Sequence, residues 1–576
     1  MRRKPKQTER LTLRGKIFRL RWLFWSVALF SALVNLLMLT GPIFMLQVYD
    51  RVLTSRSEAT LAALFALVAA LFLAMGLLEY ARGRVLARDG ARFQSELDEP
   101  VFIRTLAVAK DPENQRTPAT GLRDLEAIQR LLSGPAPLAL FDAPWAVVYL
   151  TAIFLFHPWL GWMALFGGGV LVTLALLNEF SSRKPQRNAG EARAYADLIE
   201  NEFRRHAEPV AALGMVDAAT NKWVEKRDKA LETQILASDK NAVYGAASKT
   251  VRLFLQSAML ALGALLAVRG EITPGVMIAA SILTGRALAP VEQAIAQWSP
   301  FQKARDGWRR LNRLLDQPMQ EPPEDALPTP KGKLEVEGLA VGPPRAEKPT
   351  LQGLTFKVDP GEALGVIGPS GAGKSTLIRA LAGVWPPRAG EIRLDGATLG
   401  QYAPSALGRS IGYLPQQIDL LDGTVAENIA RLDPDADRER VRAAADLAGA
   451  TELILKLPDG YETLVGAGGS SLSGGQKARI GLARALYGDP ALVLLDEPNA
   501  HLDALGEQAL RAAIDAVKAR GGAVVIVAHR PSAIAVCSRL LMLDAGAQRA
   551  FGDRDEVLQK TVANAPQLVA GQGVKG

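Results

Sequence analysis

Residues 368–375 read Gly-Pro-Ser-Gly-Ala-Gly-Lys-Ser, and this stretch indicates the fold class of the second half of the chain. The apolar run Ala363–Ile367 precedes it, and the helix-forming segment 376–382 follows it. A strand, a glycine-rich loop and a helix in this order form a phosphate-binding loop, whose backbone N–H groups turn inward around phosphate oxygens. The start of the helix adds positive potential at the same place. The motif therefore predicts a nucleotide site within an α/β domain.

Two side chains of this loop are expected to carry specific roles. Lys374 should reach the β and γ phosphates of ATP, and the Ser375 hydroxyl should ligate Mg²⁺. The candidate nucleotide-binding residues of the segment are Gly368, Pro369, Ser370, Gly371, Ala372, Gly373, Lys374, Ser375 and Thr376.

A second apolar run predicts a strand that ends in two carboxylates. Residues 491–495 are all apolar and are followed by Asp496, Glu497 and Pro498, as is typical of a buried parallel strand. Asp496 is expected to hold Mg²⁺, and Glu497 to polarise the water that attacks the γ phosphate. The alternative is an acidic turn without chemistry. The phosphate-binding loop in the same domain favours the Mg²⁺ site.

The first half of the chain has a different character, which the mean hydropathy of +0.09 conceals. The net charge of +8 could suggest nucleic-acid binding, but much of the basic charge lies just before the first apolar run. The residues concerned are Arg2, Arg3, Lys4, Lys6, Arg10, Arg14, Lys16, Arg19 and Arg21. Such a block is typical of a cytoplasmic flank beside anionic lipid, so no nucleic acid is expected as a partner. The single Cys537 allows no internal disulfide.

Six apolar segments are predicted to cross a lipid bilayer. They are residues 22–49, residues 59–78, two spans within 143–178, residues 253–268, and residues 274 to about 298. An even number of spans places both chain ends on one side, and the basic N-terminus assigns that side to the cytoplasm. The outer connections are then short. The inner connections, 81–136 and 181–248, are long and rich in helix-forming residues, so their helices should continue past the bilayer into water.

The sixth predicted span contains Arg286, and two interpretations of this charge remain open. A charge at this depth is costly unless it faces a cavity or reaches the headgroups. Arg286 could therefore line a pathway and meet the transported substrate. Alternatively, its long side chain could reach the membrane surface.

The sequence predicts five segments along the chain. A basic cytoplasmic N-terminal segment (1–21) precedes a six-helix membrane domain with long cytosolic helical extensions (22–316). Residues 317–333 contain five prolines, which exclude a regular helix or a central strand, and are interpreted as a linker. An α/β ATP-binding domain (334–560) and a C-terminal tail (561–576) follow.

One motif in the second half identifies a superfamily. The five residues Leu472, Ser473, Gly474, Gly475 and Gln476 resemble the signature motif of ABC ATPases. In that superfamily the signature motif of one subunit covers the γ phosphate held by the phosphate-binding loop of the other. The resemblance therefore implies a homodimer, with ATP and Mg²⁺ as cofactors.

Three further residues match motifs of the same superfamily. Gln416, in Tyr-Leu-Pro-Gln-Gln at 413–417, resembles the residue that senses Mg²⁺ and contacts the membrane domain. Asp503 matches the D-loop, and His529 resembles the switch histidine near the γ phosphate. The resemblance thus implies a catalytic set of Glu497, His529, Lys374 and Gln416, and a metal set of Ser375, Gln416 and Asp496.

The membrane half narrows the resemblance to one subgroup. The segments 41–53 (GPIFMLQVYDRVL), 141–145 (FDAPW) and 496–503 (DEPNAHLD) resemble those of type I secretion exporters of Gram-negative bacteria, especially protease and lipase exporters. This implies an ATPase in the inner membrane that exports an unfolded polypeptide with a C-terminal signal. It also implies a periplasmic adaptor (membrane fusion) protein and an outer-membrane channel as partners. The alternative is a lipid or small-molecule flippase, which would share every ATPase motif.

Overall fold

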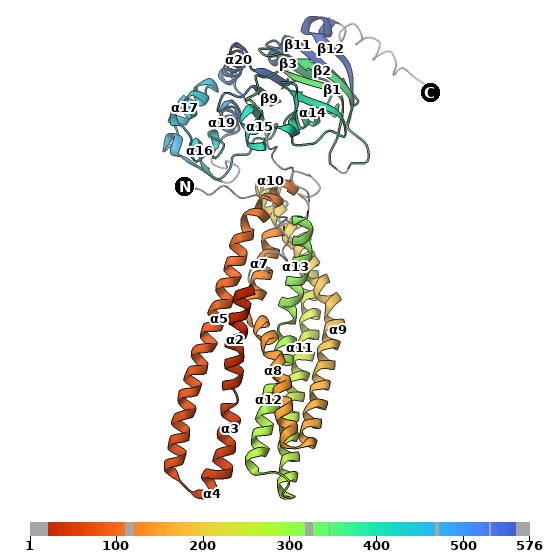
Figure 1. Cartoon of the computed structure of the whole chain (residues 1–576). Coiled ribbons are helices and arrows are strands. Elements are labelled where there is room, and N and C mark those ends of the chain that lie inside the picture. The colour runs from red at the N-terminus through yellow and green to blue at the C-terminus, as the bar shows by residue number, and fades with distance from the viewer. Residues whose placement is uncertain are drawn as a thin grey trace, which may run out of the picture. The chain divides into compact units, whose positions relative to one another are not determined.

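The computed structural model describes residues 21–109, 120–316, 327–344, 346–466, 472–500, 502–528 and 531–559. They form two compact units, a helical one that includes the described residues up to 316 and an α/β one that begins at 327 (Figure 1). Each unit is described by itself below. The exact limits of the predicted domains and of the linker 317–333 stay predictions.

The helical unit contains long helices that run alongside one another (Figure 1). Its elements are α2 (Arg21–Leu37), α3 (Thr40–Gln47), the π-helix η1 (Val48–Val52), α4 (Leu53–Ser55), α5 (Glu58–Ala109), α7 (Gly121–Ser133), α8 (Pro135–Phe156), α9 (Pro158–Arg205), α10 (Ala207–Ala212), α11 (Val216–Val268), α12 (Pro274–Ala296) and α13 (Trp298–Leu315). Six helical segments among the described residues are long and apolar enough to cross a membrane, which confirms the predicted six spans. Helices α5, α9 and α11 have 52, 48 and 53 residues, far more than the roughly 20 that a bilayer requires.

The sixth span, α12, is covered by other parts of the protein to a greater extent than the other five spans. In its most apolar window 44% of the residues are buried, against 6% for the window in α5, and its mean hydropathy of 1.3 is the lowest of the six. Glu292 of α12 forms an ion pair with Arg252 of α11. Arg286 is the one exposed residue between Gly275 and Glu292, a stretch that the structure describes completely. Both interpretations of Arg286 stay open.

A buried polar network joins three helices of this unit. Arg82 of α5 has a side chain only 3% exposed, and its guanidinium donates to Asp142 of α8 at 3.0 Å and to Glu79 at 2.8 Å. Asp142 also accepts a hydrogen bond from Asn35 of α2 at 2.6 Å. The Tyr149 hydroxyl of α8 donates to the Asn35 carbonyl at 2.8 Å. Each group is costly to bury alone, so the network stabilises one arrangement of the three helices.

Replacing Asp142 by alanine is expected to destabilise the helical unit by about 3 kcal/mol, because a buried arginine would lose the more buried of its two carboxylate partners. The change should appear as a lower thermal unfolding midpoint of the detergent-purified protein. Glu126→Gln is the control, because its pair with Arg130 on α7 is exposed and should contribute little. Equal midpoints for the two variants would show that the network does not stabilise the fold.

The second unit is built on a ten-stranded sheet with the order β5-β4-β1-β2-β12-β11-β3-β10-β9-β6. Its strands are β1 (Leu334–Val341), β2 (Leu351–Val358), β3 (Ala363–Ile367), β4 (Ala389–Leu394), β5 (Ala397–Thr398), β6 (Ile411–Leu414), β9 (Leu492–Asp496), β10 (Ala523–Val527), β11 (Arg539–Asp544) and β12 (Ala547–Asp553). Strands β7 (Gly423–Thr424) and β8 (Leu464–Val465) form a separate pair. The helices are α14 (Lys374–Leu381), η2 (Leu399–Gln401), α15 (Pro404–Ser410), α16 (Val425–Ile429), α17 (Arg438–Leu447), α18 (Thr451–Leu455), η3 (Gly460–Glu462), α19 (Gly474–Leu486), α20 (Ala504–Ala519) and α21 (Pro531–Ile534).

The parallel part of the sheet determines where the functional residues meet. Strands β11, β3, β10, β9 and β6 are neighbours and run parallel to one another. Every residue of β9 and β10 is buried, as expected for central parallel strands covered on both faces. The carboxyl ends of parallel strands meet at one edge of a sheet, where ligands of such folds bind. The loops after β3, β6 and β9 therefore lie together.

Candidate functional site

The phosphate-binding loop lies between β3 and α14, as the sequence predicts. Gly368 has φ 150° and Gly373 has φ 97°, a region of backbone space that favours glycine. A Cβ atom at Gly368 would lie 2.1 Å from the carbonyl oxygen of Leu543 on the neighbouring strand β11. Gly373 directly precedes Lys374, the first residue of α14. The glycines thus let the chain turn tightly, so that the N–H groups of the loop and those at the start of α14 face the same place.

Lys374 folds back over the loop that precedes it. Its ammonium group donates to the carbonyl oxygens of Gly368 and Pro369, each at 2.8 Å. The residue is only 6% exposed, and this burial lowers the pKa of Lys374, while the nearby Glu497 and Asp496 act in the opposite direction. A phosphate group at the loop would offer this buried cation a stronger partner than the two carbonyls do.

Asp496 ends β9 and faces the first turn of α14. The Ser375 hydroxyl donates to its Oδ1 at 3.3 Å, so two oxygen donors from distant parts of the sequence meet here. Asp496 is 2% exposed, and burial raises its pKa, while the bond from Ser375 lowers it. Mg²⁺ prefers such hard oxygen ligands and is usually held by one or two carboxylates together with phosphates and water. The described residues contain no group of three or more His, Cys, Asp and Glu side chains placed to hold a metal. The hydroxyl of Ser375 and the carboxylate of Asp496 fit a metal that also takes phosphate oxygens as ligands.

Glu497 and Gln416 come together from two strands. The amide of Gln416, which follows β6, donates to Glu497 Oε2 at 3.1 Å. Glu497 has φ 51°, an uncommon value for a residue other than glycine, and its backbone N–H donates to the Val527 carbonyl at 3.0 Å. Uncommon backbone conformations persist where the surrounding structure enforces them, often at functional sites. The Glu497 carboxylate is thereby held next to Asp496.

The signature segment forms the capped start of α19. The Ser473 hydroxyl accepts from the Gln476 N–H at 3.3 Å, and the Gln476 side chain accepts from the Ser473 N–H at 2.8 Å. This reciprocal pair is a capping box, which fixes the helix start. Leu472 before it is 7% exposed and belongs to the core. Ser473 and Gln476 thus bond each other, while Gly474 and Gly475 form the first turn of α19.

The sequence did not indicate Arg479, which joins the signature helix to the D-loop. Its side chain, 14% exposed, forms an ion pair with Asp503 and donates to the Gly449 carbonyl at 3.0 Å. Asp503 also caps α20 by accepting from the Gly506 N–H at 2.8 Å. This bond and the arginine lower the pKa of Asp503. The residues around Arg479 in the sequence do not distinguish an arginine that pairs with another loop from one that is exposed to solvent.

The structure thus brings the loop 368–375, Asp496, Glu497 and Gln416 to one edge of the sheet, while the signature segment and Asp503 form a second group. One predicted position cannot be placed, because His529 lies outside the described residues. Thr376 is buried in the first turn of α14.

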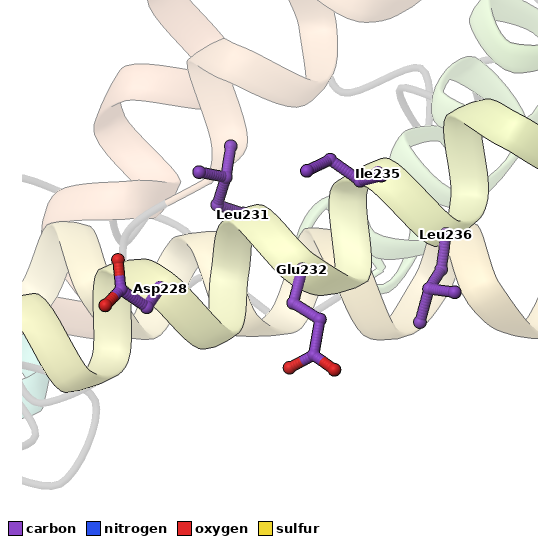
Figure 2. Close-up of a pocket in the computed structure, with 5 residues that line it drawn as sticks. All are labelled: Asp228, Leu231, Glu232, Ile235 and Leu236. Atoms are coloured by element: carbon purple, nitrogen blue, oxygen red, sulfur yellow. The ribbon is translucent and has the colours of Figure 1, made fainter.

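A separate hollow lies on the cytosolic extension of α11. It is lined by five residues of this one helix, Asp228, Leu231, Glu232, Ile235 and Leu236 (Figure 2). Leu231, Ile235 and Leu236 are each at least half exposed. An exposed apolar group of this kind is typical of a surface that another chain covers.

Comparisons with known proteins agree with both units. The family model "ABC transporter transmembrane region" matches residues 24–288, and the model "ABC transporter" matches residues 351–500. The type I secretion system ATP-binding protein PrsD of Rhizobium meliloti (strain 1021) is 46% identical over 552 residues, which are 95% of this chain and 94% of PrsD. The leukotoxin translocation ATP-binding protein LktB of Mannheimia haemolytica is 30% identical over 560 residues, which are 95% of this chain and 77% of LktB.

A solved structure shows the same fold. The ATP-bound structure of a bacterial Atm1-family ABC exporter matches with a TM-score of 0.82, at 24% identity, over 97% of this chain and 99% of the exporter chain. The expected fold, a six-span helical membrane domain fused to a P-loop ATPase domain, is thereby confirmed.

Proposed function

The chain belongs to the ABC transporter family, and from this premise we propose that it is the ATP-hydrolysing exporter of a type I secretion system. Its cargo would be an unfolded polypeptide with a C-terminal signal. The observation that carries this proposal is the 46% identity to PrsD over 95% of the chain, which spans the membrane unit as well as the ATPase unit. The chain binds ATP and is a multi-pass membrane protein with a cytosolic ATPase domain. We place it in the inner membrane because its relatives are bacterial.

The residues of the candidate site are assigned specific roles, and Gln416 is assigned two. The loop amides and Lys374 bind the phosphates of ATP, and Ser375, Asp496 and Gln416 hold Mg²⁺. When bound, this metal supplies positive charge that offsets the charge developing on the phosphates. Glu497 accepts a proton from the attacking water, and Gln416 keeps the Glu497 carboxylate in place. His529 is assigned to the γ phosphate by resemblance alone.

A second copy of the chain is proposed to complete the site. The signature segment forms a capped helix start, which is suited to bind an anion. Within the described chain the Ser473 hydroxyl serves only to cap α19, and the resemblance places such a segment over ATP of the other subunit. The exposed apolar residues Leu231, Ile235 and Leu236 of α11 support a homodimer, because a partner would remove them from water.

The mechanism follows from what ATP stabilises. Two copies close on two ATP molecules, and because ATP binds the closed form better, binding shifts the population toward it. Hydrolysis at Glu497 removes this preference and lets the copies separate. The cytosolic extensions of α5, α9 and α11 reach beyond the bilayer and are the elements proposed to transmit the motion.

The proposed partners follow from the type I secretion assignment. They are a periplasmic adaptor and an outer-membrane channel, which would form with the exporter one conduit across both membranes. The secreted polypeptide is the substrate, and the lipid bilayer surrounds the six spans.

The test is the ATPase rate of the reconstituted protein with C-terminal fragments of candidate secreted proteins encoded beside its gene. We expect a native fragment to change the rate, and a fragment of the same composition in scrambled order to leave it unchanged. Lipids and hydrophobic drugs are assayed in parallel. A response only to lipid or drug would reject polypeptide secretion and favour the flippase, while the ATPase assignments would stand.

A further inference from the structure

The membrane unit exposes very little described backbone on its outer side. Three connections lie there: residues 56–57 between α4 and α5, His157 between α8 and α9, and residues 269–273 between α11 and α12. We call these connections, with the adjoining residues 50–55, 58, 274 and 275, the outer platform. A protein partner in the periplasm that recognises the described chain outside the bilayer must contact this platform.

Side-chain contacts join the three connections into one piece. Asp50, in η1, accepts hydrogen bonds from the Thr273 hydroxyl at 2.6 Å and from the Gly275 N–H at 3.0 Å. A Cβ atom at position 275 would lie 2.7 Å from the Asp50 carboxylate oxygens, so glycine permits this approach. His157 Nε2 contacts Glu271 Oε2 at 3.0 Å. The platform is therefore preorganised, which lowers the entropic cost of binding a partner.

The same contacts pair acidic residues of the platform with other platform groups and leave its arginines without an ion-pair partner among the described residues. Two of its acidic residues, Asp50 and Glu271, are engaged within it. The side chains of Arg51, Arg56 and Arg269 are exposed and form no ion pair with any described residue. The third acid, Glu58, lies in the first turn of α5, where the helix dipole already favours a negative charge. The platform therefore presents three arginines outward.

Arginines at these positions are disfavoured for reasons of insertion and backbone geometry. Positive charge in short loops favours the cytoplasmic side during insertion, so arginines in the outer loops oppose the topology of this chain. Arg56 also has φ 49°, which is uncommon for a residue other than glycine. A binding role would account for three charges that topology disfavours, and for a residue other than glycine at position 56.

We propose that the outer platform is the docking surface for the periplasmic adaptor, and that the adaptor meets Arg51, Arg56 and Arg269 with an acidic face. This inference rests on the proposed function, because it takes the adaptor from it. Complementary charges steer association and fix orientation, so the contact should depend strongly on salt. The rigid links through Asp50 and His157 hold the three arginines at fixed spacing for such a face.

The test compares two triple variants of the full-length transporter in phosphatidylcholine nanodiscs. In one, Arg51, Arg56 and Arg269 are all replaced by glutamate, and in the other all three are replaced by lysine. The probe is the purified periplasmic adaptor encoded beside the transporter gene, and its Kd is measured by biolayer interferometry at low and high salt. We expect the glutamate variant to bind at least about tenfold more weakly and to lose the salt dependence, whereas the lysine variant keeps both. Basal ATPase activity should be the same in the wild type, the glutamate variant and the lysine variant.

The matched control is charge reversal at Arg193, Arg204 and Arg205, which are exposed on the cytosolic part of α9. This variant should bind the adaptor like the wild type. If the glutamate variant of the platform also binds like the wild type, or differs only in nanodiscs that contain anionic lipid, the platform is not the docking surface, while the secretion assignment stands. If the wild type itself does not bind the adaptor, the partner assignment of the proposed function is wrong and the platform proposal falls with it.

Discussion

The Glu497→Gln variant is expected to hydrolyse ATP about a thousandfold more slowly than the wild type while it still binds ATP. The substitution removes the carboxylate that would accept the proton of the attacking water. It preserves the shape of the side chain, and a glutamine oxygen can still accept the hydrogen bond from the Gln416 amide, which spans 3.1 Å in the wild type. Phosphate release from the reconstituted protein measures hydrolysis, and a fluorescent ATP analogue measures binding.

The control for this prediction is Glu452→Gln, the same chemical change at an exposed residue of α18 in the same domain. It should hydrolyse ATP at the wild-type rate. If Glu497→Gln retained more than about a tenth of the activity, the general base would have to be another group, because loss of a base costs at least about a hundredfold. The fold and the position of the phosphate-binding loop would be unaffected by that result.

The Lys374→Met variant is expected to bind ATP about a hundredfold more weakly, and its ATPase activity should fall with the loss of binding. Removing one partner of a buried, hydrogen-bonded charge pair costs roughly 2–5 kcal/mol, and a hundredfold change in Kd corresponds to about 2.8 kcal/mol, within this range. Methionine has a similar length and fills the same space, so the loop should keep its conformation. ATP affinity measured by calorimetry checks the prediction.

Lys456→Met, at an exposed position after α18, serves as the control and should leave the ATP affinity unchanged. Equal affinities for Lys374→Met and the wild type would mean that the bonds from Lys374 to the carbonyls of Gly368 and Pro369 persist when ATP is bound. Lys374 would then be a structural part of the loop and not a phosphate ligand.

The features that could be predicted from the sequence are those that depend on a short run of neighbouring residues. The loop 368–375 and the apolar runs before it and before Asp496 require only local order, because strand, turn and helix are specified by neighbouring residues. The membrane spans are likewise a local property, since each must be long and apolar by itself. The sequence therefore predicted six spans, and the structure confirms them.

Contacts between distant residues account for most of what could not be predicted. Arg479 and Asp503 lie on different helices, and no periodicity indicates that they pair. Asp50 belongs to the segment 41–53 that carried the resemblance to secretion exporters, yet its contact with Thr273 and Gly275 depends on how α12 packs against the first span. The free-energy cost of placing Arg286 in a membrane span could not be judged from the sequence either. The sequence does not show that α12 has the largest buried share of the six spans.

The amino-acid sequence was enough to establish the two domain types and the spans, because these depend on local composition and on motifs with fixed spacing. From such motifs it also predicted which residues bind the nucleotide. Which of those residues meet depends on the packed fold, because the parallel strands β3, β9 and β6 bring Lys374, Asp496 and Gln416 to one edge of the sheet. The packed fold also decided which charges are buried and which face outward, as for Arg82 and Arg56. The physical reason is that burial and pairing are properties of packed elements, and packing is set by contacts between residues far apart in the chain.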